Sequence, residues 1–218
     1  MRFHIITIFP DIFSSYLNES IIGRAIKNKL ILVKFYNPRD FIKAPKNNYR
    51  PVDDKPYGGG PGMVMRAEPL LKAVEKAISS IKSKNKKILT INFIPSAEKF
   101  TTTFAKNVSK KYTDIILICG RYEGIDARVD KILKTKKLSI GDYVLTGGEI
   151  PAMILVDCVS RQIEGVLGNH ESLEEERVST SEVYTRPEIL KYKNKNYKVP
   201  KVLLSGDHKK IEEWKKQK

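Results

Sequence analysis

The sequence predicts an α/β protein in which helices flank a parallel β-sheet on both faces. Apolar, strand-like runs alternate along the chain with segments of helical periodicity, an arrangement that favours parallel strands joined by helical crossovers. One run, residues 115–119 (IILIC), is apolar throughout, as in a strand buried on both faces. With 218 residues, 41% of them hydrophobic, the chain can form one medium-sized core and a small appendage.

The elements are expected in a regular order. A first strand stops at Pro10, an amphipathic helix follows it, and strands and helices then alternate. Pro151 suits the first turn of a helix, where its missing N–H is no loss, so an apolar helix is expected directly after it. The predicted strands cover residues 2–9, 30–36, 87–94 and 114–119, and the predicted helices cover residues 11–28, 68–81, 99–109, 126–134 and 152–163.

Two loops are the best candidates for a binding site. The buried run 115–119 ends at Gly120 and continues as RYEGID, so polar side chains follow the carboxyl end of a strand, where open α/β sheets bind ligands. Residues 139–151, SIGDYVLTGGEIP, contain glycines that allow tight turns and close approach of a ligand to the backbone. The spacing alone leaves two interpretations open, a ligand site or ordinary turns.

A third segment, residues 37–66, is long and polar and contains YGGGPG, which is more than a connector needs. Met63 stands where a dinucleotide fingerprint requires its third glycine, and no Gly-Lys-Ser/Thr ending of a nucleotide-triphosphate loop follows. The segment is therefore either a flexible loop or part of a site of another kind.

The charge balance favours a polyanionic partner. The formal net charge is +15, which suits nucleic acid or an anionic membrane surface. No apolar run reaches the roughly 20 residues that span a bilayer, so nucleic acid is the better choice. Two cysteines in apolar runs, with no secretion signal, suggest reduced thiols in the cytoplasm. The three histidines are far apart, so no metal site is expected.

The carboxyl-terminal part differs in composition from the rest. Residues 164–183 are polar and rich in glutamate, as expected of a linker. Residues 207–216 have the pattern of a helix with Asp207 as its N-cap. Between these two segments, lysines alternate with Tyr192 and Tyr197, a pattern that suits either phosphate contact with base stacking or a solvated basic face.

Several strings resemble the bacterial tRNA (guanine-N1-)-methyltransferases, which belong to the SPOUT class. The two longest are GRYEGID at residues 120–126 and SIGDYVLTGGE at residues 139–149. The others cover nearly the whole chain in the family's order: IFP at 8–10, GRA at 23–25, PRDF at 38–41, VDD at 52–54, PYGGGPGM at 56–63, GVLG at 165–168, YTRPE at 184–188 and LLSG at 203–206, followed by His208 and Trp214.

This resemblance implies a trefoil knot at the end of the catalytic domain, although the sequence pattern itself gives no sign of one. It also implies methylation of N1 of guanosine 37, which lies 3′ to the anticodon, in support of the reading frame. The partners would be tRNA and a second copy of the chain, whose linker completes the site. The domains would be a SPOUT-like catalytic domain at 1–163, a linker at 164–183 and a small helical tRNA-binding domain at 184–218.

S-adenosylmethionine is the methyl donor that the resemblance implies, held by main-chain groups of three loops. Family members commonly have Ser, Gln and Gly at the positions of Ile94, Ser96 and Ala97, but contacts there are largely main-chain, so binding should survive. The cofactor-binding residues expected on this basis are Phe93, Pro95, Gly120, Tyr122, Glu123, Gly124, Ile140, Gly141, Asp142, Tyr143, Val144, Leu145, Gly147, Gly148 and Pro151.

The same resemblance suggests the catalytic residues. Arg161 aligns with the family's arginine, and a guanidinium suits charge developing on O6 because it stays protonated. Glu176 stands where the family has an aspartate as general base. The extra methylene and a shortened linker leave Glu175 or Glu174 as alternatives. Glu123 is a further candidate, for catalysis, for binding or for a magnesium ion.

The sequence leaves two other functions to compare with this one. A tRNA-binding homologue with impaired catalysis would explain the glutamate at position 176 and the short linker. A nicotinamide-dependent oxidoreductase is disfavoured because no G-x-G-x-x-G follows the first strand.

Overall fold

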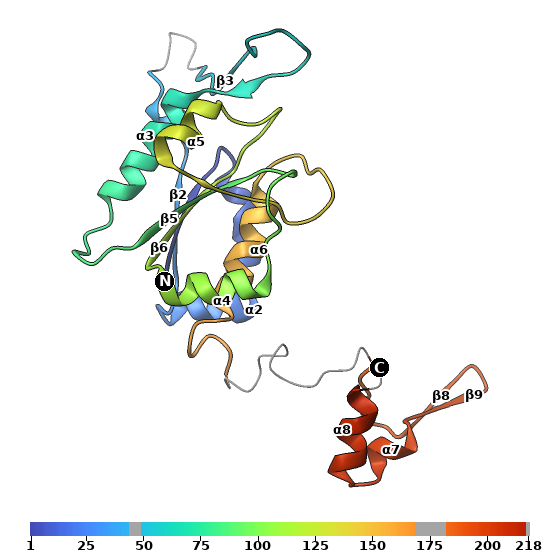
Figure 1. Cartoon of the computed structure of the whole chain (residues 1–218). Coiled ribbons are helices and arrows are strands. Elements are labelled where there is room, and N and C mark those ends of the chain that lie inside the picture. The colour runs from blue at the N-terminus through green and yellow to red at the C-terminus, as the bar shows by residue number, and fades with distance from the viewer. Residues whose placement is uncertain (44–48, 169–181, 217–218) are drawn as a thin grey trace. The chain divides into compact units, whose positions relative to one another are not determined.

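The structure, a computed structural model, describes residues 1–43, 49–168 and 182–216 (Figure 1). Contacts within the chain divide it into two units, Met1–Leu167 and Gly168–Lys218. Each unit is described by itself. None of the helices in the described part of the chain has the length and apolar character needed to cross a membrane.

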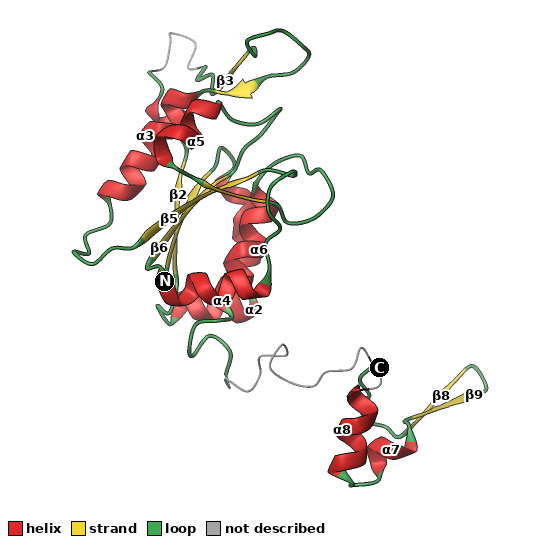
Figure 2. Ribbon diagram, in the orientation of Figure 1, coloured by secondary structure: helices red, strands yellow, loops and turns green. Residues whose placement is uncertain are grey.

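A five-stranded parallel sheet forms the centre of the first unit (Figure 2). The central strand β6 (Asp114–Ile118) pairs with β1 (Arg2–Ile6) on one side and with β5 (Ile88–Phe93) on the other. The edges are β2 (Leu32–Tyr36), next to β1, and β7 (Lys136–Leu138), next to β5. The predicted parallel sheet is therefore confirmed, and β7 is a strand that the sequence pattern did not indicate.

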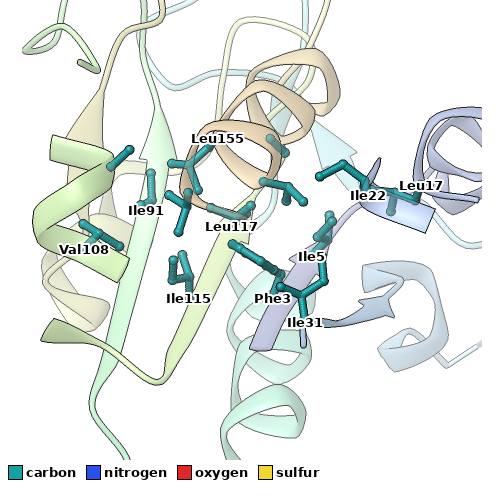
Figure 3. Close-up of a cluster of buried hydrophobic side chains, with 14 of the residues drawn as sticks. Phe3, Ile5, Leu17, Ile22, Ile31, Ile91, Val108, Ile115, Leu117 and Leu155 are labelled. Atoms are coloured by element: carbon teal, nitrogen blue, oxygen red, sulfur yellow. The ribbon is translucent and has the colours of Figure 1, made fainter. Parts of the chain in front are cut away.

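Side chains of β6 alternate between two apolar cores, one on each face of the sheet. Ile115 and Leu117 face the larger core, which Figure 3 shows. Helices α1 (Ser14–Leu17), α2 (Ser20–Lys27), α4 (Thr102–Lys111) and α6 (Glu149–Ser160) cover this face. Because all five residues of β6 are buried, the strand is apolar throughout apart from Asp114, as a central parallel strand requires.

The opposite face carries the second core. Ile116 and Ile118 of β6 pack there against α3 (Ala67–Ser79) and α5 (Ala127–Leu133), which lie together on that side of the sheet in Figure 1. Met65 at the end of β4 (Val64–Met65) is fully buried in this core. The core therefore holds one end of segment 37–66 against the sheet.

The prediction of one continuous helix over residues 11–28 is wrong. The segment forms a 3₁₀ turn, η1 (Pro10–Phe13), then α1 and α2, with Ser20 in the left-handed region at φ 52°. A β-carbon on Gly23 would lie 2.5 Å from the backbone oxygen of Asn18. The break thus brings the end of α1 closer to α2 than a straight helix could, and only glycine fits at the contact.

Segment 37–66 is more ordered than the predicted loop. It contains η2 (Pro38–Phe41) and a short antiparallel pair, β3 (Asp53–Asp54) with β4. The predicted helix at 152–163 begins earlier, at Glu149, so that Pro151 lies within its first turn as expected. The other helices and strands of this unit lie within a few residues of their predicted bounds.

The second unit combines a hairpin with two helices. Strands β8 (Ile189–Tyr192) and β9 (Lys195–Lys198) pair antiparallel across a two-residue turn, Lys193 and Asn194, both with positive φ, as the favoured hairpin turns require. Helices α7 (Lys201–Leu204) and α8 (His208–Lys216) follow. Asp207 caps α8 as predicted, accepting a hydrogen bond from the Lys210 N–H at 3.2 Å. The hairpin was not predicted.

A buried polar network ties together the amino ends of the central strands. The Asp114 carboxylate accepts hydrogen bonds from Arg2 at 2.6 and 2.7 Å, from Thr113 at 2.6 Å and from His4 Nε2 at 3.0 Å. Burial by itself would raise the pKa of Asp114, but these hydrogen bonds outweigh it and lower the pKa from 3.8 to about 2. The ionised carboxylate therefore stabilises the fold.

Substituting Asp114→Asn should lower the free energy of unfolding by about 2 kcal/mol at pH 7, the value of a shift of this size. Since the folded pKa is depressed, this contribution is complete above pH 3.8 and is lost as the pH falls toward 2. Urea unfolding of both proteins at pH 7 and pH 3 measures it, with the exposed Asp11→Asn as control. A deficit that stays constant between these pH values would contradict the role of the charge.

Candidate functional site

A cavity of about 400 Å³ lies at the carboxyl ends of β5, β6 and β7. This is the edge where parallel α/β sheets bind ligands, and the volume falls within the range of small-molecule sites. Three segments that follow these strands form most of its wall: residues 93–95 after β5, 120–125 after β6 and 138–140 after β7. The turn that leads into α6 closes the cavity.

The first site loop, residues 119–126, is held against the segment that precedes α3. Glu123 N–H donates to the Met63 carbonyl at 3.0 Å, and Met65 N–H donates to the Gly124 carbonyl at 2.9 Å. Gly124 has φ 123°, a conformation that side chains rarely allow, and an added β-carbon there would meet nothing within 4 Å. The backbone of Met63 and Met65 therefore holds the loop in place, while the missing side chain at Gly124 leaves open space beside it.

The second site loop, residues 139–148, returns the chain to the end of β6. Gly148 N–H donates to the Gly120 carbonyl at 2.9 Å, and Arg121 forms an isolated antiparallel bridge with Gly147. A β-carbon on Gly148 would lie 2.6 Å from the Cys119 Cα and 3.0 Å from the Gly120 nitrogen. Because both are backbone atoms, only glycine allows the two loops to meet here.

A buried carboxylate joins this junction to the first strand. Glu149 is 2% exposed, and its Oε1 accepts a hydrogen bond from the Thr7 hydroxyl at 2.8 Å. Its Oε2 lies 2.9 Å from Arg121 Nη2, at ion-pair distance but without an aligned hydrogen bond. The Arg121 guanidinium also stacks over the Phe9 ring, 4.7 Å from its centroid. Glu149 and Arg121 therefore connect the segment after β1 to both site loops.

Large apolar side chains are exposed at the cavity. Tyr122 is 50% exposed, Tyr143 53% and Val144 81%. Burial first, and then the nearby Asp53 carboxylate, raise the pKa of Tyr122, so its phenol stays protonated at neutral pH. Exposed apolar surface beside glycine-lined backbone suits a flat, largely apolar ligand with a polar edge.

Thirteen of the fifteen residues predicted to bind a cofactor line this one cavity. The exceptions are Gly141 and Asp142, which lie in the same loop but outside the lining; Asp142 pairs instead with Lys99 at 2.5 Å. The lining residues from the prediction are Phe93, Pro95, Gly120, Tyr122, Glu123, Gly124, Ile140, Tyr143, Val144, Leu145, Gly147, Gly148 and Pro151.

Of the predicted catalytic residues, Glu123 and Arg161 lie in the described part of the chain, and the two are far apart within one chain. Glu123 lines the cavity. Arg161 is the C-cap of α6, twelve residues beyond Glu149, so about 18 Å of helix separates it from the cavity end of α6. Glu176 and its alternatives Glu174 and Glu175 lie outside the described residues. Among the described residues, no group of three or more His, Cys, Asp or Glu side chains could hold a metal ion.

Three polar residues in the cavity wall were missed by sequence reasoning: Asn92, Asp130 and Lys137. Two of them carry a weak signal in the sequence. Asn92 is a polar residue near the carboxyl end of a predicted strand, and Asp130 lies four residues after Asp126 in a predicted helix. Lys137 gave none, because β7 was not predicted.

This fold and site define an α/β protein with a small-molecule cavity in the loops after three parallel strands. A family model described as "tRNA (Guanine-1)-methyltransferase TrmD" matches residues 1–218. The chain therefore belongs to the tRNA (guanine-1)-methyltransferase family, as the resemblance in the sequence predicted.

Individual relatives agree with this assignment. The tRNA (guanine-N(1)-)-methyltransferase of Clostridioides difficile is 46% identical over 100% of this chain and 91% of its own length. That of Buchnera aphidicola is 44% identical over 97% of this chain and 86% of its own length. The crystal structure of tRNA (m1G37) methyltransferase from Aquifex aeolicus matches with a TM-score of 0.78 and 40% identity, over 100% of this chain and 88% of that one.

The contact between the two site loops can be tested at Gly148. Gly148→Ala should destabilise the protein by about 1–3 kcal/mol, because the new methyl group meets backbone that cannot move aside. Thermal unfolding followed by circular dichroism measures the loss. Gly168→Ala is the control, since a β-carbon there meets nothing within 4 Å. Equal stability of the two variants would show that the loops tolerate a wider spacing.

Proposed function

We propose that this protein transfers the methyl group of S-adenosylmethionine to N1 of guanosine 37 in tRNA and so supports the reading frame. One observation carries the proposal: the two strings that most resemble the family, residues 120–126 and 139–149, meet at the wall of a single cavity at the carboxyl edge of the sheet. The activity for which the relatives are named supports the reaction. These similarities favour an active enzyme over an impaired tRNA-binding homologue.

The residues present fit such a cofactor. The cavity offers apolar surface at Tyr143 and Val144 for an adenine ring, and glycine-rich backbone at Gly120 and Gly124 for polar contacts. When bound, the cofactor supplies a methyl group on a positively charged sulfur, which an electron pair on a nucleophile can attack. The exposed apolar side chains would exclude water from that reaction.

Methylation at N1 requires that the N1 proton leave and that negative charge moving toward O6 be stabilised. A guanidinium can donate two hydrogen bonds and stays charged, so we assign the O6 contact to Arg161. We assign removal of the N1 proton to Glu176, because this residue stands where the family has an aspartate as general base. Glu123 on the cavity wall would bind the methyl donor or take part in catalysis. Any magnesium ion would need water and substrate ligands beside this carboxylate.

The distance between Arg161 and the cavity points to a second subunit. Ile150, Met153, Ile154, Asp157 and Cys158 line an open apolar groove together with residues of η1 and α1. Their spacing of three and four residues places them on one face of α6, and Arg161 continues that stripe. Ile12, Tyr16 and Ile150 in this groove are 42%, 42% and 49% exposed.

We therefore propose a homodimer that packs this face of α6 against the same face of its partner. In a two-fold contact with antiparallel helices, the carboxyl end of α6 lies beside the amino end of its partner. The amino end of α6 is at the cavity, where Gly148 and Pro151 are part of the lining. Arg161 of one subunit would then reach the cavity of the other, and the linker after it would complete the site.

The second unit is proposed to contact tRNA through its hairpin. The register of β8 and β9 places Leu190, Tyr192, Lys195 and Tyr197 on one face, and all four are exposed. Aromatic rings stack on unpaired bases and lysines contact phosphates, so this face suits single-stranded RNA such as an anticodon loop. Residues 164–183 would act as linker between domains at 1–163 and 184–218.

The family's trefoil knot stays a prediction, because strand order and pairing alone do not define how the chain is threaded. It is consistent with the return of the chain to the end of β6 at Gly148. A cytoplasmic location also stays a prediction. It would place the protein with its tRNA, and Cys119 and Cys158 form no disulfide with each other.

Transfer of labelled methyl from S-adenosylmethionine to tRNA transcripts tests the function. A transcript with guanosine at position 37 should be labelled, and one with adenosine there should not, because N1 of adenine carries no proton to lose and its ring has no O6. Label on both transcripts would contradict the assigned specificity. No label on either, with cofactor binding intact, would favour the binding homologue.

Complementation between two inactive variants tests the shared site. Arg161→Ala should lower kcat by about 10²–10³-fold, and Val144→Glu should block the cavity with a charge. If Arg161 serves the partner, mixed dimers contain one intact site of two. Mixing by co-expression should then restore about a quarter of wild-type activity. Each variant expressed alone is the control, and absence of recovery in dimers verified by ultracentrifugation would assign Arg161 to the cavity of its own chain.

A further inference from the structure

A polar cluster forms one wall of the cavity and is not explained by methyl transfer. Asn92 comes from β5, Asp130 from α5 and Lys137 from β7, and all three line the cavity. These three residues are called the polar wall. They are distinct from the glycine-rich loops and from Arg161.

The geometry of the polar wall is well defined. Asn92 Nδ2 donates to both carboxylate oxygens of Asp130, at 3.0 and 3.2 Å, and the Thr135 hydroxyl donates to Oδ1 at 2.5 Å. Lys137 Nζ lies 3.3 Å from Oδ2. Asn92 and Lys137 are partners in the register of β5 and β7, so their side chains leave the same face of the sheet.

Only part of this cluster is needed to hold the fold. Asn92 is 3% exposed and the Asp130 side chain 10%, so their hydrogen bonds attach α5 to the sheet. Lys137 is half exposed, and an ammonium has three protons, of which Asp130 can take one. The Asn92 side-chain carbonyl accepts a hydrogen bond from no described group. The Lys137 ammonium is therefore available as a donor and the Asn92 carbonyl as an acceptor, in addition to the internal contacts.

A pair of neighbouring hydroxyls matches this set. Each hydroxyl both donates and accepts, so Lys137 can donate to one while Asn92 or Asp130 accepts from the other. The charges of Lys137 and Asp130 balance each other, and Asp130 would repel a ligand carboxylate placed at Lys137. In dinucleotide-binding folds, an acidic side chain contacts a ribose hydroxyl in the same way.

We infer that the polar wall binds the 2′ and 3′ hydroxyls of the ribose of a nucleoside cofactor and makes the site selective for ribose. The inference rests on the proposed function, because it assumes a nucleoside in this cavity. It predicts selectivity between two ligands that differ in one hydroxyl, and a purely structural role of the cluster does not.

Isothermal titration calorimetry of the full chain tests this inference with S-adenosylhomocysteine and its 2′-deoxy analogue. Wild-type protein should prefer the ribose form by about tenfold or more, since hydrogen bonds to charged groups are worth this much. In Lys137→Met and Asp130→Asn the preference should fall toward one. The matched control is Lys136→Met, because Lys136 is the adjacent residue of β7, pairs with Glu98 and is not part of the lining.

The outcomes separate the inference from the proposed function. If both variants keep the wild-type preference, the inference is wrong even when their absolute affinities fall, while binding of S-adenosylhomocysteine still supports the proposed function. If wild-type protein binds neither ligand, both proposals are wrong. Lys137→Met removes a half-exposed side chain, so it decides the question should Asp130→Asn fail to fold.

Discussion

The contact between Gly148 and the end of β6 is the constraint on which the cavity depends. The hydrogen bond from Gly148 to Gly120 closes a loop of the chain that has meanwhile formed α5 and β7. A side chain at Gly148 would overlap the Cys119 backbone, so the loops could not meet at this spacing. The cavity forms because the chain leaves the carboxyl end of β6 and returns to it at Gly148.

Burial of charge strengthens the same junction. Glu149 begins α6, where the positive end of the helix dipole favours a carboxylate, and it also meets Arg121 and Thr7. Removing one member of a buried ion pair leaves the other without compensation, which is costly. The close contact of the loops at Gly148 and the buried charge of Glu149 therefore stabilise the same arrangement. In it, the segments after β1, β6 and β7 are held together.

The two ends of α6 carry different parts of the proposed active site. Its amino end, through Gly148 and Pro151, belongs to the cavity wall, whereas Arg161 lies at the other end beyond an apolar stripe. A single chain therefore offers a place for a methyl donor but keeps its proposed catalytic cation about one helix length away. The exposed groove along the stripe gives a physical reason why the proposed dimer would be needed for activity, since it would bring the two together.

The sequence by itself determined the parallel sheet, the start of a helix near Pro151, the cap at Asp207 and the two glycine-containing loops at the cavity, because burial periodicity and glycine in loops are local properties of the chain. The individual residues of the cavity lining were expected from the family resemblance. Tertiary structure decided the rest. The break at Ser20 depends on how closely α1 and α2 approach, and β7 exists only by pairing with β5. The polar wall was out of reach for the same reason: Asn92, Asp130 and Lys137 are separated along the chain, and only folding makes them neighbours.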